Sequence, residues 1–147
     1  MDKQIIFEKR RDLRLVTIRR GGTLNDSDHR LIAKWAADCA QHVLHLFEEE
    51  RPDDDRPRIA IEQARAWARG EITTGQAVAV AHMAAHELGA SAYGIRAVRA
   101  ASSEDRRDEA GCSEFRWQHA QLPREIRDLV RDDQQLRNRK YWSLFTC

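Results

Sequence analysis

Cysteine is scarce in this sequence, and its three residues, Cys39, Cys112 and Cys147, lie far apart. An odd number of widely spaced cysteines does not make the disulfide framework of a small secreted protein. No two of them have the CxxC spacing of a zinc site. We therefore expect buried thiols, with Cys39 acting as a small hydrophobic residue on an apolar helix face.

Targeting and membrane-spanning segments are also missing. The opening residues, MDKQIIFEKRRD, hold no apolar core of signal-peptide length. The apolar stretch at residues 77–95 is rich in alanine and includes His82, His86 and Glu87, a composition that gains little from lipid. We expect a cytoplasmic protein that does not enter a membrane.

Neither sign of charge is in large excess, because 25 Lys and Arg residues face 24 Asp and Glu residues for a net charge of +1. Proteins that bind nucleic acids in general carry a basic surplus over a whole face, so we do not expect such a partner here. The charges are unevenly placed, however. Residues 1–22 hold seven basic and three acidic side chains, whereas residues 48–55 hold six acidic side chains and one basic.

Motifs of catalysis are absent as well. There is no GxSxG nucleophile elbow, no glycine-rich phosphate loop and no paired cysteine motif. The string AAHELGASAYG begins like the HExxH signature of zinc proteases, but Ala90 stands where the second histidine of that signature must be. We expect no enzyme activity and no cofactor.

Two histidines remain candidate metal ligands. His82 and His86 are four residues apart and would share one face of a helix, so they could seed a metal site if another segment supplied a third ligand such as Asp38, Cys39 or His42. The alternative is a pair of hydrogen-bonded histidines in a tightly packed helical bundle. A single sequence does not show whether ligands from distant segments converge.

What the sequence does contain is helical periodicity. Between Ala77 and Ile95 only Glu87 carries a full charge, so residues 76–98 are predicted to form a buried, alanine-rich central helix. Small residues in this stretch would let neighbouring helices approach closely. A length of 147 residues suits one domain with a single core, so we expect residues 1–147 to form one helical domain.

Amphipathic helices are predicted on both sides of this stretch. Asn25 caps a helix that continues to about Glu49, with an apolar stripe that includes Leu31, Trp35 and Cys39. A second helix starts near Pro57 and is stopped by Gly70. We predict an all-α bundle of about five helices in a single domain.

The C-terminal third continues the helical pattern. Ser102 and Asp105 have the spacing of a capping box, which would start a helix ending near Leu122. Pro123 precedes a short helix with an inward stripe at Ile126, Leu129 and Val130. The final YWSLFTC is aromatic enough that we expect it to pack against the bundle.

The basic N-terminal segment, residues 1–22, is ambiguous. Val16, Thr17 and Ile18 favour a strand, and Gly21 with Gly22 would break it, so a short β-hairpin is one interpretation. A helix of one or two turns is the other.

The acidic turn is the most distinctive charged feature of the chain. We use this name for six carboxylates within eight residues, namely Glu48, Glu49, Glu50, Asp53, Asp54 and Asp55. Such carboxylates repel one another and would seldom be selected for stability. They are candidate partner-binding residues that would steer a basic protein by long-range attraction, whereas an ordinary solvated loop is the alternative.

Several strings carry a family resemblance, most specifically WAADCA, DDDRPR and ARAWARGEI, together with GQAVAVAHMAAHELGASAYGIRAV and the closing YWSLFTC. Through them nearly the whole chain resembles the helical immunity-protein family found beside bacterial polymorphic toxins. The resemblance implies an all-α, non-enzymatic, cytoplasmic protein that binds and neutralises a cognate toxin. It implies no catalytic residues.

The chain departs from that family at one point. Relatives carry a further alanine-rich helical segment between GEIT and GQAVAVAH, whereas here Thr74 is followed directly by Gly75 and Gln76. A second copy of the chain could cover the side left open, which would make a homodimer. Two other functions stay open, namely a metal-binding regulator that uses His82 and His86, and a purely structural homo-oligomeric bundle.

Overall fold

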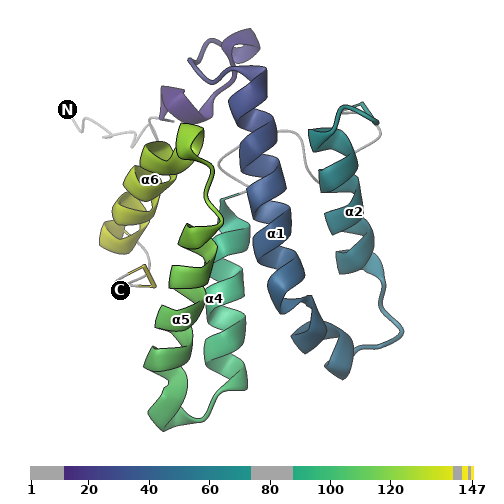
Figure 1. Cartoon of the computed structure of the whole chain (residues 1–147), viewed down its shortest axis with the longest axis vertical. Helices are drawn as coiled ribbons and strands as arrows, with labels where there is room; N and C mark the ends of the chain where they lie inside the picture. The colour runs from purple at the N-terminus through teal and green to yellow at the C-terminus, as the bar shows by residue number, and fades with distance from the viewer. Residues whose placement is uncertain (1–11, 74–87, 141–143, 146) are drawn as a thin grey trace, which may run out of the picture.

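The computed structural model describes residues 12–73, 88–140, 144, 145 and 147 (Figure 1). The α-helices in these ranges are α1 (Asp26–Glu50), α2 (Arg56–Ala68), α4 (Gly89–Ala101), α5 (Arg107–Ala120) and α6 (Arg127–Lys140). Short 3-10 helices are η1 (Leu13–Leu15), η2 (Ile18–Arg20), η3 (Glu104–Arg106) and η4 (Arg124–Ile126). The predicted all-α bundle of about five helices is confirmed.

The first helix has the boundaries that its sequence predicts. The Asn25 side chain accepts a hydrogen bond from the Asp28 amide at 2.7 Å, an N-cap of a kind that contributes about 1 kcal/mol. Gly70 follows α2 with φ 75°, a left-handed conformation that glycine adopts at little cost. Both helix ends are therefore set by local backbone chemistry.

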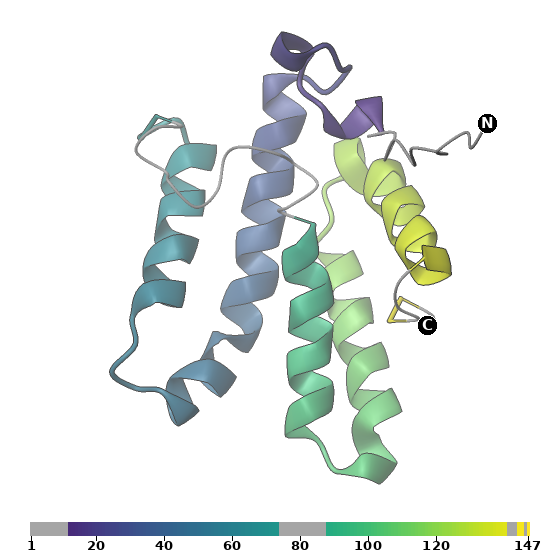
Figure 2. The ribbon, with the colours of Figure 1, turned by 180° about the vertical axis from the view of Figure 1, so that it is seen from behind.

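The bundle is arranged around α1, which packs against α2 on one side and α4 on the other, while α4 also packs against α5 (Figures 1 and 2). Trp35 of α1 is almost fully buried, and its indole nitrogen donates to the Gln118 carbonyl of α5 at 2.9 Å. Trp35 belongs to a core cluster that joins α1 to the N-terminal segment, η4 and α6. The other buried members of this cluster are Leu15, Leu24, Ile32, Cys39, Leu88, Leu122, Ile126 and Val130.

The predicted central helix is described only from Leu88 onward. Here α4 begins at Gly89, Leu88 lies in a turn, and the helix continues to Ala101. The prediction of a helix over residues 76–98 is thus confirmed from Gly89 to Val98, whereas residues 76–87 lie outside the described residues. Leu88, which precedes α4, is buried in the same core cluster as Trp35. Within α4, Ser91, Ala92, Gly94 and Ile95 are buried.

Small residues do allow close helix packing in α4. A Cβ atom added at Gly94 would lie 3.0 Å from the Gln118 side-chain nitrogen and 3.7 Å from the Cys39 carbonyl oxygen. Glycine at this position therefore lets α4 approach both α1 and α5.

The predicted N-terminal hairpin is wrong for the described part of the segment. Residues 12–25 form η1, η2 and one isolated parallel bridge between Thr17 and Leu24. The chain turns at Gly21, whose φ of 89° is left-handed, and Leu15 and Leu24 enter the core on either side of the turn. Burying these two leucines at the start of α1 takes the place of strand pairing.

The predicted capping box at Ser102 and Asp105 is also wrong. The Ser102 hydroxyl donates to the Val98 carbonyl at 2.7 Å, so it serves the end of α4. Beyond it the chain enters η3 before α5 begins at Arg107. Ser102 satisfies a carbonyl that the helix end leaves without a partner.

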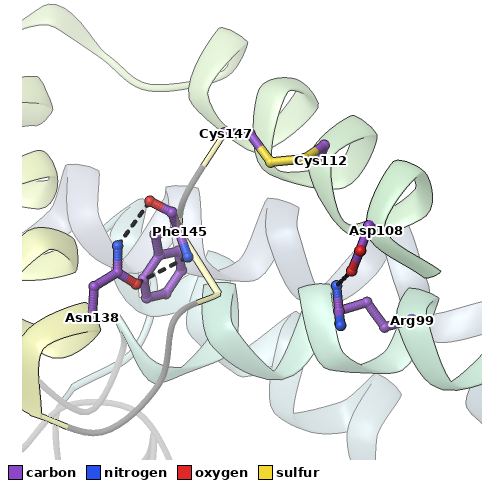
Figure 3. The surroundings of a disulfide bond; sticks show 6 residues. All are labelled: Arg99, Asp108, Cys112, Asn138, Phe145 and Cys147. Atoms are coloured by element: carbon purple, nitrogen blue, oxygen red, sulfur yellow. Dashed lines mark hydrogen bonds and ion pairs between the residues drawn. A yellow bond between two sulfur atoms is a disulfide. The ribbon is translucent and has the colours of Figure 1, made fainter.

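The prediction of three buried thiols is correct only for Cys39, whose side chain is fully buried. Cys112 of α5 and Cys147 form a disulfide between half-buried and exposed positions (Figure 3). Phe145 is buried against Ala92 and Ile95, and Asn138 of α6 holds its backbone with hydrogen bonds of 2.8 and 3.0 Å. The predicted docking of the C-terminal segment is confirmed at Leu144 and Phe145, whereas Tyr141 and Trp142 lie outside the described residues.

Candidate partner-binding surface

The acidic turn joins α1 to α2. Glu48, Glu49 and Glu50 form the last turn of α1, and Asp53, Asp54 and Asp55 precede α2. Pro57 lies in the first turn of α2, where its missing amide hydrogen costs the helix nothing. The structure therefore brings all six predicted carboxylates together at one end of the α1–α2 pair.

Two of the six carboxylates are paired within this region. Glu48 accepts two hydrogen bonds from the Arg58 guanidinium, at 2.6 and 3.0 Å, and these bonds lower the pKa of Glu48. Asp54 accepts side-chain bonds from Arg56 at 2.5 and 2.8 Å, which lower its pKa to about 2. Both pairs are exposed to solvent, so they orient the turn more than they stabilise the fold.

The other four carboxylates, Glu49, Glu50, Asp53 and Asp55, are exposed to solvent. No ion pair joins any of them to another residue within the described ranges. The acidic turn thus presents negative charge that its own arginines do not neutralise. Such charge attracts cations over about 8–10 Å at physiological ionic strength.

An apolar groove opens next to these carboxylates, between α2 and α4. Its volume is about 760 Å³. The floor comes from the C-terminal half of α1 and includes Val43, Leu44 and Phe47. One wall is Pro57, Ala60 and Ile61 of α2, and the other wall is α4, which contributes Ala90, Tyr93, Gly94, Ala97, Ala100 and Ala101. The side chains of α4 here are mostly methyl groups, which leaves the space between the walls unfilled.

The candidate metal ligands His82 and His86 lie outside the described residues. Each possible third ligand already has another role. Asp38 pairs with Lys34 and Arg65, His42 pairs with Glu114, and burial raises the pKa of the Cys39 thiol. Within residues 12–73 and 88–140, no three His, Cys, Asp or Glu side chains are grouped so that they could hold a metal ion.

Sequence reasoning missed a buried polar network on the other side of α1. Gln118 of α5 is fully buried, accepts from the Ser91 hydroxyl at 2.5 Å and donates to the Glu114 carboxylate at 3.2 Å. Glu114 is 4% exposed and also bonds His42 Nδ1 of α1 at 2.8 Å. Gln134 of α6 donates to the Ser91 hydroxyl at 3.1 Å.

The network therefore links four helices, α1, α4, α5 and α6. Its bonds between helices join residues 27 to 72 positions apart in the chain. No local sequence pattern pairs residues at such separations, which is why the network could not be predicted. Because its members bond one another inside the bundle, we interpret it as structural.

Comparison with known proteins gives a family match over most of the chain. The family model described as "Imm-5 like putative immunity protein" matches residues 22–75 and again residues 72–125. The two matches meet where the resemblance places a missing helical segment. No curated protein and no solved structure matches the chain. Among the helices that the structure describes, none has the length and apolarity to span a lipid bilayer. Since the two matches together cover more than half of its length, the chain belongs to the Imm-5 like immunity protein family.

Proposed function

We propose that this protein binds a cognate bacterial toxin and neutralises it by protein–protein contact, without catalysis of its own. The family match over residues 22–125 is the observation that carries the proposal. The acidic turn supports it as a contact region, since four exposed carboxylates at one end of the molecule favour a basic partner.

The proposed place of action is the cytoplasm, as one domain over residues 1–147. A reducing cytoplasm keeps thiols reduced, so Cys112 and Cys147 would be free thiols there. The C-terminal segment would then be held by Phe145 and by its hydrogen bonds with Asn138. Neither the acidic turn nor the groove includes a cysteine, so binding would not depend on the redox state.

The test uses the product of the reading frame immediately upstream of the gene as the toxin. We expect that inducing this product alone arrests growth, that co-expressing the immunity protein restores growth, and that the two purified proteins form a one-to-one complex at low salt. Growth arrest that persists despite abundant immunity protein, with no complex on size-exclusion chromatography, would contradict the proposal.

A charge variant tests whether the acidic turn takes part. D53K/D55K reverses two carboxylates without an ion pair and leaves the Asp54–Arg56 pair in place. We expect association to slow by about tenfold at low salt, since steering acts on the encounter rate. The matched control is E109K/E125K, which makes the same charge change at exposed residues outside the turn and should associate like wild type.

A further inference from the structure

The groove combines an apolar floor with charge at one end only. Of its described lining residues only Glu49 and Glu50 are charged. Both belong to the last turn of α1, so one end of the groove is acidic and the rest is apolar. A ligand that matched the whole groove would therefore be apolar along its length and positively charged at one end.

Helix ends strengthen this asymmetry. The C-terminal ends of α1 and α4 lie at the same end of the molecule (Figure 2), and Ala100 and Ala101 of α4 line the groove there. A helix C-terminus carries partial negative charge, so these two ends add to the field of Glu49 and Glu50. The N-terminus of α2 lies at this end as well, and its partial positive charge offsets part of the negative field. The exposed carboxylates of Asp53 and Asp55, which precede α2, add negative charge at the same place.

The shape of the groove fits a helix. The groove is lined by α2 and α4, which run in opposite directions on either side of α1 (Figure 2), and by the surface of α1 between them. Ala90, Ala97 and Ala101 of the α4 wall are seven and four residues apart and so lie on one face of the helix, and their small side chains let another backbone approach closely. A helix that lays an apolar stripe into such a groove is a common mode of protein recognition.

We infer that this groove is the docking site for an amphipathic helix of the toxin, oriented with Lys or Arg residues against Glu49 and Glu50. The inference rests on the proposed function and names the surface and the kind of segment that the toxin contributes. A second copy of this chain fits the groove less well. The described lining residues include no Lys, Arg or His, so groove-to-groove pairing would leave Glu49 and Glu50 without a cation.

The experiment measures binding of the upstream gene product to the full-length protein and three groove variants. Ala97→Trp fills the groove from α4, and Ala100→Trp does so from an exposed position one turn later, in case the first variant does not fold. Each should weaken binding by at least about tenfold, because apolar anchors dominate interface affinity. E49K/E50K should slow association by about tenfold and reduce its salt dependence, whereas E109K/E125K should behave like wild type.

The possible outcomes separate the two proposals. If the wild-type protein does not bind the upstream product, the proposed function fails and the inference fails with it. If the wild-type protein binds and the folded tryptophan variants bind equally well, the inference alone is overturned. A homodimer that Ala97→Trp abolishes while toxin binding is unchanged would also overturn the inference, since a second copy would then be the occupant.

Discussion

The two sides of α1 are built by different means. Toward α4 and α5, the contact is closed by Trp35, by the absence of a side chain at Gly94 and by the network around Gln118. Toward α2, the shared cluster is smaller and consists of Ala37, Leu44, Ile61 and Ala64 with Ala40 beside it. Next to this cluster, the space between α2 and α4 is not filled by side chains and forms the groove.

The difference shows how one short chain can hold a specific packed core and also keep a surface open for a partner. Buried hydrogen bonds specify a single arrangement, because each partner left unpaired would be costly. Methyl groups along a helix impose no such arrangement and leave room for another protein. We therefore expect substitutions on the two sides to separate stability from binding.

One of the two largest effects is expected for Gln118→Leu. Leucine keeps most of the volume but removes the acceptor of the buried Ser91 hydroxyl and one of the two bonds to the buried Glu114 carboxylate, so we expect a loss of about 3 kcal/mol in the free energy of unfolding. Urea unfolding followed by circular dichroism measures this quantity.

Ala97→Leu is the matched change on the groove side of α4. It adds an apolar side chain to open space, so the free energy of unfolding should change by about 0.5 kcal/mol or less. Equal losses for Gln118→Leu and Ala97→Leu would mean that the two sides do not differ as described.

A loss of similar size to that of Gln118→Leu is expected from the disulfide, which lies on the α4–α5 side of the bundle. Removing it in C112S/C147S frees a loop between residues 35 positions apart, and loop-closure entropy predicts a loss of about 3–4 kcal/mol. Urea midpoints with and without reductant provide the measurement. Reductant should destabilise the wild-type protein and leave C112S/C147S unchanged, and an insensitive wild-type protein would show that the bridge contributes nothing.

The smallest effect concerns pH. Burial lowers the pKa of His119 below its ordinary value of 6.5, although its hydrogen bond with Gln134 opposes the shift. The unfolded chain therefore binds a proton at a pH where folded His119 does not, so protons favour unfolding and stability falls as pH drops below 6.5.

His119→Gln should lack this component of the pH dependence. Comparing its urea midpoint with that of wild type above and below pH 6.5 isolates the contribution of His119. Parallel changes in the two proteins would show that the imidazole is not responsible. For neither protein should the affinity for a groove ligand depend on the titration of residue 119, because His119 is not among the described residues that line the groove.

Helix ends set by local chemistry could be predicted from the sequence. Asn25, Pro57 and Gly70 act on the backbone within one turn of themselves, and the structure places each as expected. The acidic turn was predicted as well, but its division into paired and unpaired carboxylates was not, because Glu48 finds Arg58 only after the chain reverses. The disulfide and the groove depend on distant segments meeting, which no local pattern encodes.

The attachment of α2 has a consequence for experiments. Within the described residues, α2 packs chiefly against α1, and only Ile61 and Ala64 of its side chains are buried. Segments with little buried apolar surface open locally at lower free energy than the core, so the α2 amides should exchange their hydrogens with solvent sooner than those around Trp35. A ligand that bridged α2 and α4 would slow this exchange, and deuterium uptake would then report occupancy of the groove without any structure of the complex.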